Sequence, residues 1–270
     1  MIRNSVIIPQ QDRGDEVRRQ LPGLAAVLDK LGEPYEIVVV DDGSSSATQR
    51  LLEKLLMECR ALRALRLDQP AGVSVALAAG IRAARGEVLI ALEPGLTYPP
   101  EQIPALLNLL QRGDLVMGRR RHFGAAKLWQ RIGRVPRWLL LGLDGHDPDC
   151  LFWAARREVF SDLNLTAGMA RYLPALVRPR GFRVCEAYVQ RQGPAQPLQD
   201  LRANPGDLLA AWWHCRRWRS QTVCELFAGG MAERPALRIV GGGENSMRHD
   251  HAASEVAFPS GQHPPLVKRA

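Results

Sequence analysis

Two adjacent carboxylates are the feature of this sequence best suited to binding a ligand. Asp41 and Asp42 directly follow Ile37–Val40, a continuous run of apolar, β-branched residues that is typical of a buried strand. Gly43 comes next and allows the chain to turn sharply beside them. Carboxylates in this position can accept hydrogen bonds from the N–H group of a base and from ribose hydroxyls. Asp-Asp-Gly is also a common turn sequence, so the motif needs support from its surroundings.

The segments around this motif alternate between predicted strands and helices. The expected strands are Ser5–Ile8 (ended by Pro9), Ile37–Val40, Leu62–Leu67, Val88–Leu92 and Leu115–Met117; the expected helices span 15–31, 46–59 (begun by a capping box at 46–49) and 73–84, with another from Pro99. Apolar strands that alternate with helices indicate a mostly parallel sheet with helices on both faces. Ligands of such sheets bind at the carboxyl ends of the strands, where Asp41 and Asp42 are expected.

Beyond Gly118 the pattern is less regular. Helices are expected at 128–143, 171–180 and 207–219, and strands at 151–154 and 182–189. From about residue 229 to residue 270 the composition turns to Gly, Ser, His and Pro, which predicts a disordered tail. We therefore expect one domain over 1–220, divided into halves at 1–117 and 118–220, followed by a tail over 229–270.

The net charge of +8 comes from one segment. Residues 118–219 hold 18 Lys and Arg against 8 Asp and Glu, together with all six tryptophans. A basic, Trp-rich segment suits phosphate ligands or an anionic membrane surface, although a solvated arginine-rich surface has the same composition. The expected helix 207–219, which ends in Arg216, Arg217 and Arg219, either docks on anionic lipid or packs its tryptophans onto the core. No nucleic-acid-binding motif accompanies the charge, so no nucleic-acid partner is expected.

Several other classes of protein are disfavoured by the sequence. No G-x-G-x-x-G dinucleotide motif follows a strand, there is no Walker P-loop, and residues 72–76 lack the second glycine of a nucleophile elbow. The five cysteines show no paired or metal-binding spacing, no signal-peptide pattern opens the sequence, and no apolar run approaches the ~20 residues of a membrane span. We expect a cytoplasmic protein, either free or bound peripherally at the inner face of the membrane.

The order of several motifs resembles the GT-A domain of family 2 glycosyltransferases, most closely the dolichyl- or polyprenyl-phosphate sugar synthase branch. The matching segments are 5–9, 37–45, 80–90, 98–104 and 114–120, followed by 147–148, 156–160, 171–175, 180–184 and 207–212, so the resemblance covers roughly residues 4–220. It implies a GT-A (Rossmann-like) fold with a basic helical extension. It also implies a hexosyltransferase-type enzyme that moves a sugar from a nucleotide-sugar donor to a lipid-phosphate acceptor.

The resemblance also implies roles for individual residues. The residues implied to bind the nucleotide are Pro9, Asp12, Asp41, Asp42 and Gly43. Those implied to take part in catalysis are Glu93, Arg120 and Arg191, and the residue implied to bind a metal ion is Glu93. Arg119 and Arg121 would assist in neutralising the phosphates of the leaving group.

Some positions depart from the family pattern. The D-x-D metal motif is replaced by Glu93-Pro94-Gly95, which keeps one carboxylate, so only weak binding of Mg²⁺ or Mn²⁺ is expected. After the first strand, where the family has Asn followed by acidic residues, Asp12 is followed by Arg13, and of the later His-Arg-Pro-Arg segment only Arg191 remains. These changes support a second hypothesis, a catalytically degenerate module that binds a nucleotide or a partner protein.

Overall fold

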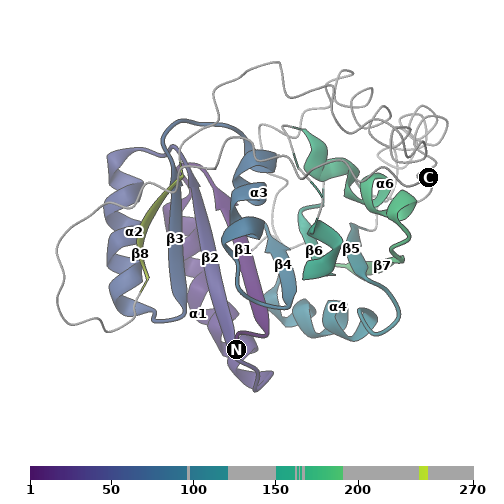
Figure 1. The fold of residues 1–270 in the computed structure, drawn as a ribbon. Coiled ribbons are helices and arrows are strands. Elements are labelled where there is room, and N and C mark those ends of the chain that lie inside the picture. The colour runs from purple at the N-terminus through teal and green to yellow at the C-terminus, as the bar shows by residue number, and fades with distance from the viewer. Residues whose placement is uncertain are drawn as a thin grey trace, which may run out of the picture.

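The computed structural model describes residues 1–95, 98–120, 150–161, 163, 165, 168–190 and 237–242, with only the course of the backbone at residues 120 and 237–242. Within these residues, eight strands form one sheet in the order β7-β5-β6-β4-β1-β2-β3-β8 (Figure 1). The strands are β1 (Asn4–Gln10), β2 (Tyr35–Asp42), β3 (Leu62–Leu67), β4 (Val88–Leu92), β5 (Leu115–Arg120), β6 (Phe152–Arg156), β7 (Val184–Val189) and β8 (Leu237–Gly242). The helices are α1 (Gly14–Lys30), α2 (Ser46–Glu58), α3 (Val73–Ala83), α4 (Ile103–Leu109) and α6 (Leu173–Val177), with single 3₁₀ turns at Pro100–Gln102, Arg157–Phe160, Met169–Tyr172 and Arg178–Arg180.

The sheet is mostly parallel, as the sequence predicts. β1 pairs in parallel with both β2 and β4, β2 with β3, and β5 with β7. β6 is antiparallel to its neighbours β4 and β5, and β8 is antiparallel to β3 at the far edge. All strands from β1 to β5 therefore point the same way, and their carboxyl ends meet at one edge of the sheet.

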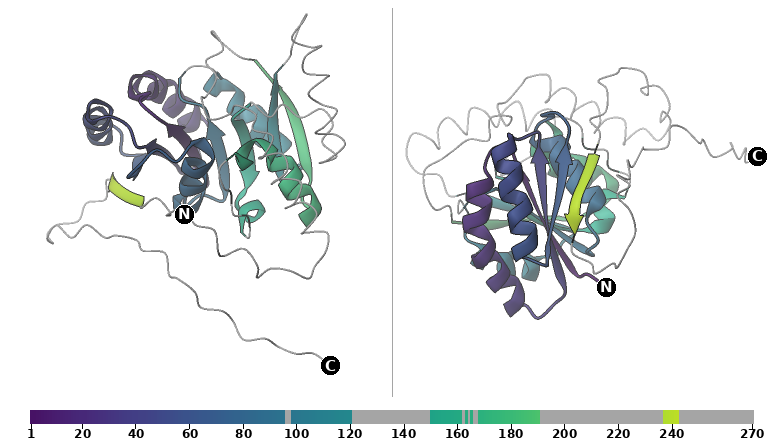
Figure 2. Two further views of the ribbon diagram at one scale, coloured as in Figure 1. Left: turned by 90° about the horizontal axis from the view of Figure 1, so that it is seen from above. Right: turned by 90° about the vertical axis from the view of Figure 1, so that its left-hand side faces the viewer.

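Two layers of helices bury the two faces of the sheet. Ile7, Val38 and Val40 belong to the core under α3 and α6, whereas Ile8 and Val39 belong to the core under α1, α2 and α4. Successive residues of β1, β2 and β4 thus enter opposite cores, which is why Val6–Ile8, Ile37–Val40 and Val88–Leu92 are apolar at every position rather than at every second one. Figure 2 shows α1 and α2 side by side on one face of the sheet.

Most of the predicted elements are confirmed, with three differences. Pro9 does not end β1, which continues to Gln10 with Pro9 opposite Val40. The predicted capping box at 46–49 is wrong: Ser45 is the N-cap residue of α2, without a side-chain capping bond, because its hydroxyl donates to Asp12. The helix predicted at 171–180 consists of α6 between two 3₁₀ turns, with prolines at 174 and 179 limiting its length.

Other sequence predictions lie partly or wholly outside the described residues. The strand β8 lies within the segment for which the composition predicts a disordered tail, and the rest of 229–270 is outside the described part of the chain. The helices predicted at 128–143 and 207–219, with five of the six tryptophans, are also outside it. The sixth, Trp153 on β6, is fully buried in the core and cannot contact a membrane.

Candidate functional site

The order in which the chain builds the sheet reverses between β1 and β4. From β1 the chain moves to β2 and then β3 on one side, whereas β4 and the strands that follow it up to β7 lie on the other side of β1. In open α/β sheets, ligands bind at the carboxyl ends of the strands at such a reversal. Asp12, Asp41, Asp42 and Glu93 lie at the carboxyl ends of β1, β2 and β4, so the structure brings four predicted site residues to this edge.

Asp41 has an incomplete set of hydrogen bonds. The residue is 2% exposed, and its Oδ1 accepts from Gln10 Nε2 at 2.7 Å and from Ser44 N at 3.3 Å. Its Oδ2 is buried without a hydrogen-bond partner in the described part of the chain. Burial raises the pKa of Asp41, and the hydrogen bonds from Ser44 only partly oppose this. A ligand N–H or hydroxyl group that donated to Oδ2 would relieve a substantial desolvation cost.

The carboxylate of Asp42, in contrast, is bound to the loop between β3 and α3. Its Oδ1 accepts from Ala71 N at 2.7 Å, and its Oδ2 accepts from Gly72 N at 2.8 Å. Gly72 is the N-cap residue of α3, so Asp42 holds the backbone that leads into this helix. In this structure Asp42 therefore positions the loop beside Asp41.

Gly43 allows the same loop to approach closely. Its φ of +67° lies in the left-handed region, and a Cβ atom here would lie 2.6 Å from Pro70 N. Because the obstructing atom belongs to the backbone, a side chain at this position would force the loop to move. Gly43 and Asp42 thus fix the loop together.

Asp12 connects the loop after β1 to the start of α2. Its exposed carboxylate accepts, through Oδ1, from Ser45 N at 2.9 Å, Ser45 Oγ at 2.7 Å and Thr48 Oγ1 at 3.2 Å. These bonds, with the Ser45 hydroxyl contributing most, lower the pKa of Asp12. Asp12 thus carries a negative charge at the edge of the sheet and helps to hold its two loops together.

The other predicted site residues have different outcomes. Pro9 is buried within β1, one residue before Gln10, whose side chain binds Asp41. Arg120 ends β5, and its side chain lies outside the described part of the structure, as does all of Arg191. The neighbouring Arg119 donates to Glu186 Oε2 at 3.0 Å and lies 5.5 Å from the ring centroid of Tyr188.

Glu93 follows β4 directly and is held by residues from the first helix. Its side chain is 6% exposed, and its Oε1 lies 3.9 Å from Nη1 of Arg13, the N-cap residue of α1. Gln20 of α1 accepts a hydrogen bond from Gly95 N at 3.0 Å and donates to the backbone oxygen of Glu93 at 3.4 Å. The loop that carries Glu93 is therefore attached to α1.

Comparison with known proteins agrees with this geometry. The sequence profile of the family described as "Glycosyl transferase family 2" matches residues 5–163, which is more than half of the chain and includes β1 to β6. The chain belongs to glycosyltransferase family 2. The match contains Asp12, Asp41, Asp42 and Glu93, so the edge described above lies within the family domain.

Curated relatives include bacterial polyprenyl-phosphate sugar transferases. The chain is 28% identical over 190 residues to undecaprenyl-phosphate 4-deoxy-4-formamido-L-arabinose transferase of Pseudomonas aeruginosa strain PAO1, covering 68% of this chain and 56% of the relative. It is also 28% identical to dodecaprenyl-phosphate galacturonate synthase of Rhizobium johnstonii, covering 64% and 53% respectively. The chain thus spans little more than half the length of the curated relatives it matches.

Solved structures with the same fold are also glycosyltransferases. Glucosyl-3-phosphoglycerate synthase from Mycobacterium tuberculosis, in complex with Mn²⁺, UDP and glucosyl-3-phosphoglycerate, superimposes with a TM-score of 0.60 at 18% identity, covering 79% of this chain and 80% of that one. Mannosyl-3-phosphoglycerate synthase from Rubrobacter xylanophilus gives a TM-score of 0.58 at 17% identity, covering 83% and 77%. These similarities confirm the GT-A fold of this family 2 member.

The side chains near Glu93 do not fit a divalent metal ion in this conformation. Glu93 is ion-paired with Arg13, Gly95 offers no ligand, and Glu16, the nearest other carboxylate to Gly95, is also ion-paired with Arg13. Within the described residues, no group of three or more His, Cys, Asp and Glu side chains is placed to hold a metal. Without the phosphates of a bound nucleotide, the single carboxylate of Glu93 gives Mg²⁺ too few protein ligands.

Three residues of this edge were not singled out from the sequence: Gln10, Glu16 and Gln20. Gln20 gave a usable signal, because it is a polar residue on the apolar face of α1 and is completely buried. Gln10 is the last residue of β1 and links Asp41 to the backbone N–H of Arg13, which donates to Gln10 Oε1 at 2.9 Å. Glu16 resembles an ordinary acidic residue in the first turn of a helix, so nothing in the sequence distinguishes it.

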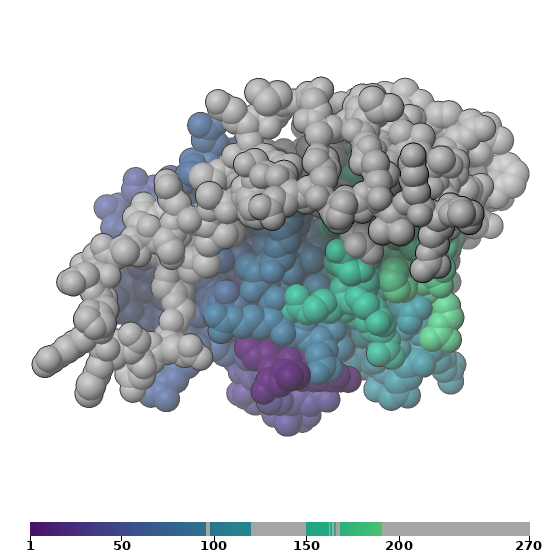
Figure 3. Space-filling model, in the orientation of Figure 1, coloured from purple at the N-terminus to yellow at the C-terminus, as the bar shows by residue number. Residues whose placement is uncertain are grey.

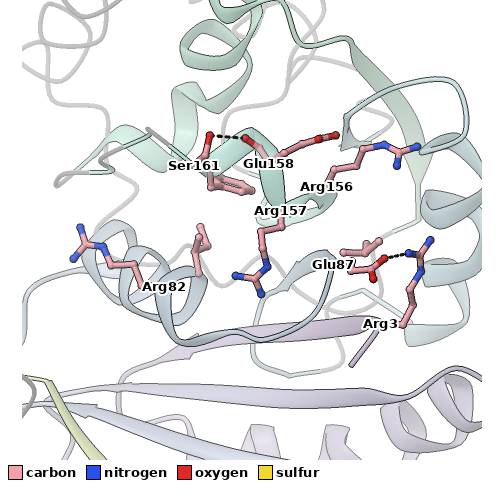
Figure 4. Close-up of a pocket in the computed structure, with 10 residues that line it drawn as sticks. Arg3, Arg82, Glu87, Arg156, Arg157, Glu158 and Ser161 are labelled. Atoms are coloured by element: carbon pink, nitrogen blue, oxygen red, sulfur yellow. Dashed lines mark hydrogen bonds and ion pairs between the residues drawn. The ribbon is translucent and has the colours of Figure 1, made fainter. Parts of the chain in front are cut away.

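A cavity of about 600 Å³ lies at the opposite edge of the sheet, where the parallel strands begin (Figure 4). Its lining includes Arg3, Glu87 and Arg157, and the start of the chain, coloured purple, is visible at the lower edge of the face in Figure 3. Arg3 is paired with Glu87, and Arg157 donates to the backbone oxygens of Gly86 and Ala84 at 2.7 and 2.6 Å. We assign the functional site to the carboxyl edge instead, because ligands of open α/β sheets bind there, at the reversal of strand order.

Among the described residues, no helix is both long enough and apolar enough to cross a bilayer.

Proposed function

We propose that this protein transfers a sugar from a nucleotide-sugar donor to a polyprenyl-phosphate-like lipid acceptor. The observation that carries the proposal is the buried, unsatisfied Oδ2 of Asp41 beside the reversal point of a family 2 glycosyltransferase sheet. The curated relatives, which act on undecaprenyl and dodecaprenyl phosphates, support the choice of acceptor.

In the proposed complex, Asp41 accepts a hydrogen bond from the nucleoside part of the donor. Asp42 and Gly43 hold the neighbouring loop in place, and Asp12 joins the loops that follow β1 and β2. The acceptor phosphate attacks the sugar at its anomeric carbon, and the bond from that carbon to the nucleoside diphosphate breaks. A phosphate with a second pKa of about 6 is already ionised near neutral pH, so the attack does not require a strong protein base.

The lipid acceptor places the reaction at a membrane surface. The basic segment 118–219 supplies charge of the right sign for anionic lipid, and we propose that it brings the protein to the cytoplasmic face. Arg120 and Arg191 are proposed to neutralise phosphate charge there, the role that the family resemblance gives them.

A transfer assay tests this function. Purified protein is incubated with undecaprenyl phosphate in anionic vesicles and a panel of radiolabelled UDP-, GDP- and CDP-sugars, and label in the lipid fraction is counted. Wild type is expected to label lipid from at least one donor, and Asp41→Asn is expected to label it at least about tenfold more slowly. Failure of every donor to label lipid, while a known polyprenyl-phosphate transferase does so in the same vesicles, would reject the proposal.

The pairing of Glu93 with Arg13, beside a glycine at residue 95, favours a second candidate: a module that binds nucleotide without turnover. The two functions separate in one experiment, since the module binds nucleotide sugar in calorimetry but leaves it intact in the transfer assay. Cleavage of the donor rejects the module.

A further inference from the structure

Arg13 places a positive charge between two carboxylates at the reversal point of the sheet. Its Nη2 is ion-paired with Glu16 Oε2 one helical turn along α1, and its Nη1 lies 3.9 Å from Glu93 Oε1 at the end of β4. The side chain of Arg13 is only 17% exposed, so this cation is confined rather than spread over the surface. The guanidinium thus bridges the elements on the two sides of the crevice.

Gly95, in the loop after β4, leaves room for the side chain of Glu16, which pairs with Arg13. A Cβ atom on Gly95 would lie 2.7 Å from Glu16 Oε2, and the φ of +97° at Gly95 disfavours any side chain. An acidic residue at position 95 would therefore require the end of the Glu16 side chain to shift, and it would also adopt a disfavoured backbone conformation. Glycine at 95 accommodates the Arg13–Glu16 pair as it stands.

Arg13 is also connected to the proposed nucleoside-binding residue. Its backbone N–H donates to Gln10 Oε1, and the amide nitrogen of the same Gln10 side chain donates to Asp41 Oδ1. Gln10 therefore ties the backbone at Arg13 to the carboxylate of Asp41, and both residues belong to the carboxyl edge of the sheet. A guanidinium carries five donors in a planar fork that matches phosphate oxygens, and it keeps its charge at any physiological pH.

We propose that the guanidinium of Arg13 serves as a built-in cation for the donor's diphosphate, so that nucleotide binding does not depend on a divalent metal ion. The inference rests on the proposed function, because it assigns a residue to the diphosphate of that same donor. It differs from a weakened metal site, in which nucleotide affinity would still rise when metal is added.

Calorimetry with UDP and GDP as probes tests the inference, with each titration run once in EDTA and once in MnCl₂. Wild type is expected to bind at least one of the two nucleotides with affinities that agree within about twofold in both buffers. Arg13→Gln is expected to lose about tenfold to a hundredfold in EDTA, as for loss of a charge-assisted hydrogen bond. Mn²⁺ should restore part of this loss, because Glu16 and Glu93 would no longer be neutralised.

Arg18→Gln is the matched control. It removes the same charge from the same helix at a side chain that is 58% exposed and pairs with Asp15, so nucleotide affinity should not change. A loss in Arg13→Gln that Mn²⁺ leaves unaltered would indicate a structural role only and would overturn the inference.

The two proposals fail differently. Wild-type binding that requires Mn²⁺ overturns the role of Arg13 and leaves the proposed function intact, and this comparison needs no variant to fold. Absence of binding to every nucleotide in both buffers rejects the proposed function and the inference together.

Discussion

Asp41 and Asp42 are adjacent in sequence and both buried, yet their carboxylates have opposite environments. Both oxygens of Asp42 accept hydrogen bonds from backbone N–H groups of the β3–α3 loop, whereas Oδ2 of Asp41 is buried without a donor in the described structure. Burial raises the pKa of Asp41, so the ionised form is costly in the ligand-free protein. The motif therefore combines a carboxylate available to a ligand with one that fixes a loop.

Substituting each acid by asparagine should separate these roles. Asp41→Asn removes a poorly solvated charge, so the ligand-free protein should keep its stability while UDP or GDP affinity falls by about 1–3 kcal/mol. Asp42→Asn leaves one acceptor for two N–H donors, so the free energy of unfolding should fall by about 1–3 kcal/mol, with a loss of affinity as the loop shifts. Urea denaturation and calorimetry on both variants provide the test. Loss of stability in Asp41→Asn with unchanged affinity would reverse the assignment.

At the scale of elements, the loop between β3 and α3 depends on the close approach of Gly43. Gly32 gives a matched comparison, because it has the same φ of +67° but no atom within 4 Å of the position that a Cβ would take, whereas a Cβ on Gly43 would lie 2.6 Å from Pro70 N. Gly32→Ala should cost about 1–2 kcal/mol of stability for the left-handed backbone alone. Gly43→Ala should cost at least about 1 kcal/mol more, because the backbone of the loop must move. Equal losses in urea denaturation would show that the loop is not held in this way.

The strands were predicted well from the sequence where burial of both faces alone determined their composition. Ile37–Val40 is apolar throughout because both faces of β2 are buried, and the same holds for Val88–Leu92 of β4. Pro9 was misjudged as a strand end, since a parallel strand can include a proline where no partner requires its N–H. The N-cap residue of α2 is Ser45, one residue before the predicted Ser46. The hydroxyl of Ser45 donates to Asp12, which is distant in sequence, so local sequence did not reveal this contact.

The site was less predictable than the sheet because its contacts join distant parts of the chain. The position of Asp41 at the carboxyl edge followed from strand order and from the family resemblance. The pairing of Arg13 with Glu93 could not be predicted, because 80 residues separate them in the sequence. The arginine at position 13 was visible only as a difference from the acidic residues that the family has after the first strand. Burial of Gln20 likewise depends on the loop that it supports.

For the whole molecule, Glu36 of β2 joins three other segments of the chain through hydrogen bonds. It should therefore contribute to the pH dependence of the protein's stability. Ser5 Oγ and the backbone N–H of Arg85 donate to its Oε1, and Arg63 Nη1 donates to its Oε2 at 2.5 Å. Burial alone would raise the pKa of Glu36, but these hydrogen bonds and the Arg63 charge outweigh it and lower the pKa below the ordinary value of 4.5. A depressed carboxyl pKa stabilises the fold above that ordinary value, and the contribution is lost as the pH falls through the folded-state pKa.

Glu36→Gln should therefore be less stable than wild type near pH 7, by about 1–3 kcal/mol, with the difference shrinking as the pH falls below 4.5. Urea denaturation across this range measures it. Glu53→Gln, at an exposed position of α2, should follow the wild-type curve. A difference between wild type and Glu36→Gln that stays constant with pH would contradict the role given to this carboxylate.

The proposed function requires a nucleotide to bind at the carboxyl edge of the sheet and not in the cavity at its other edge. Hydrogen–deuterium exchange with and without UDP or GDP tests this location most directly. We expect slower exchange at the carboxyl ends of β1, β2 and β4, around Arg13, Asp41–Ser44 and Gly95, with no change around Arg3 and Glu87. Protection confined to the segments that line the cavity, around Arg3, Glu87 and Arg157, would contradict it.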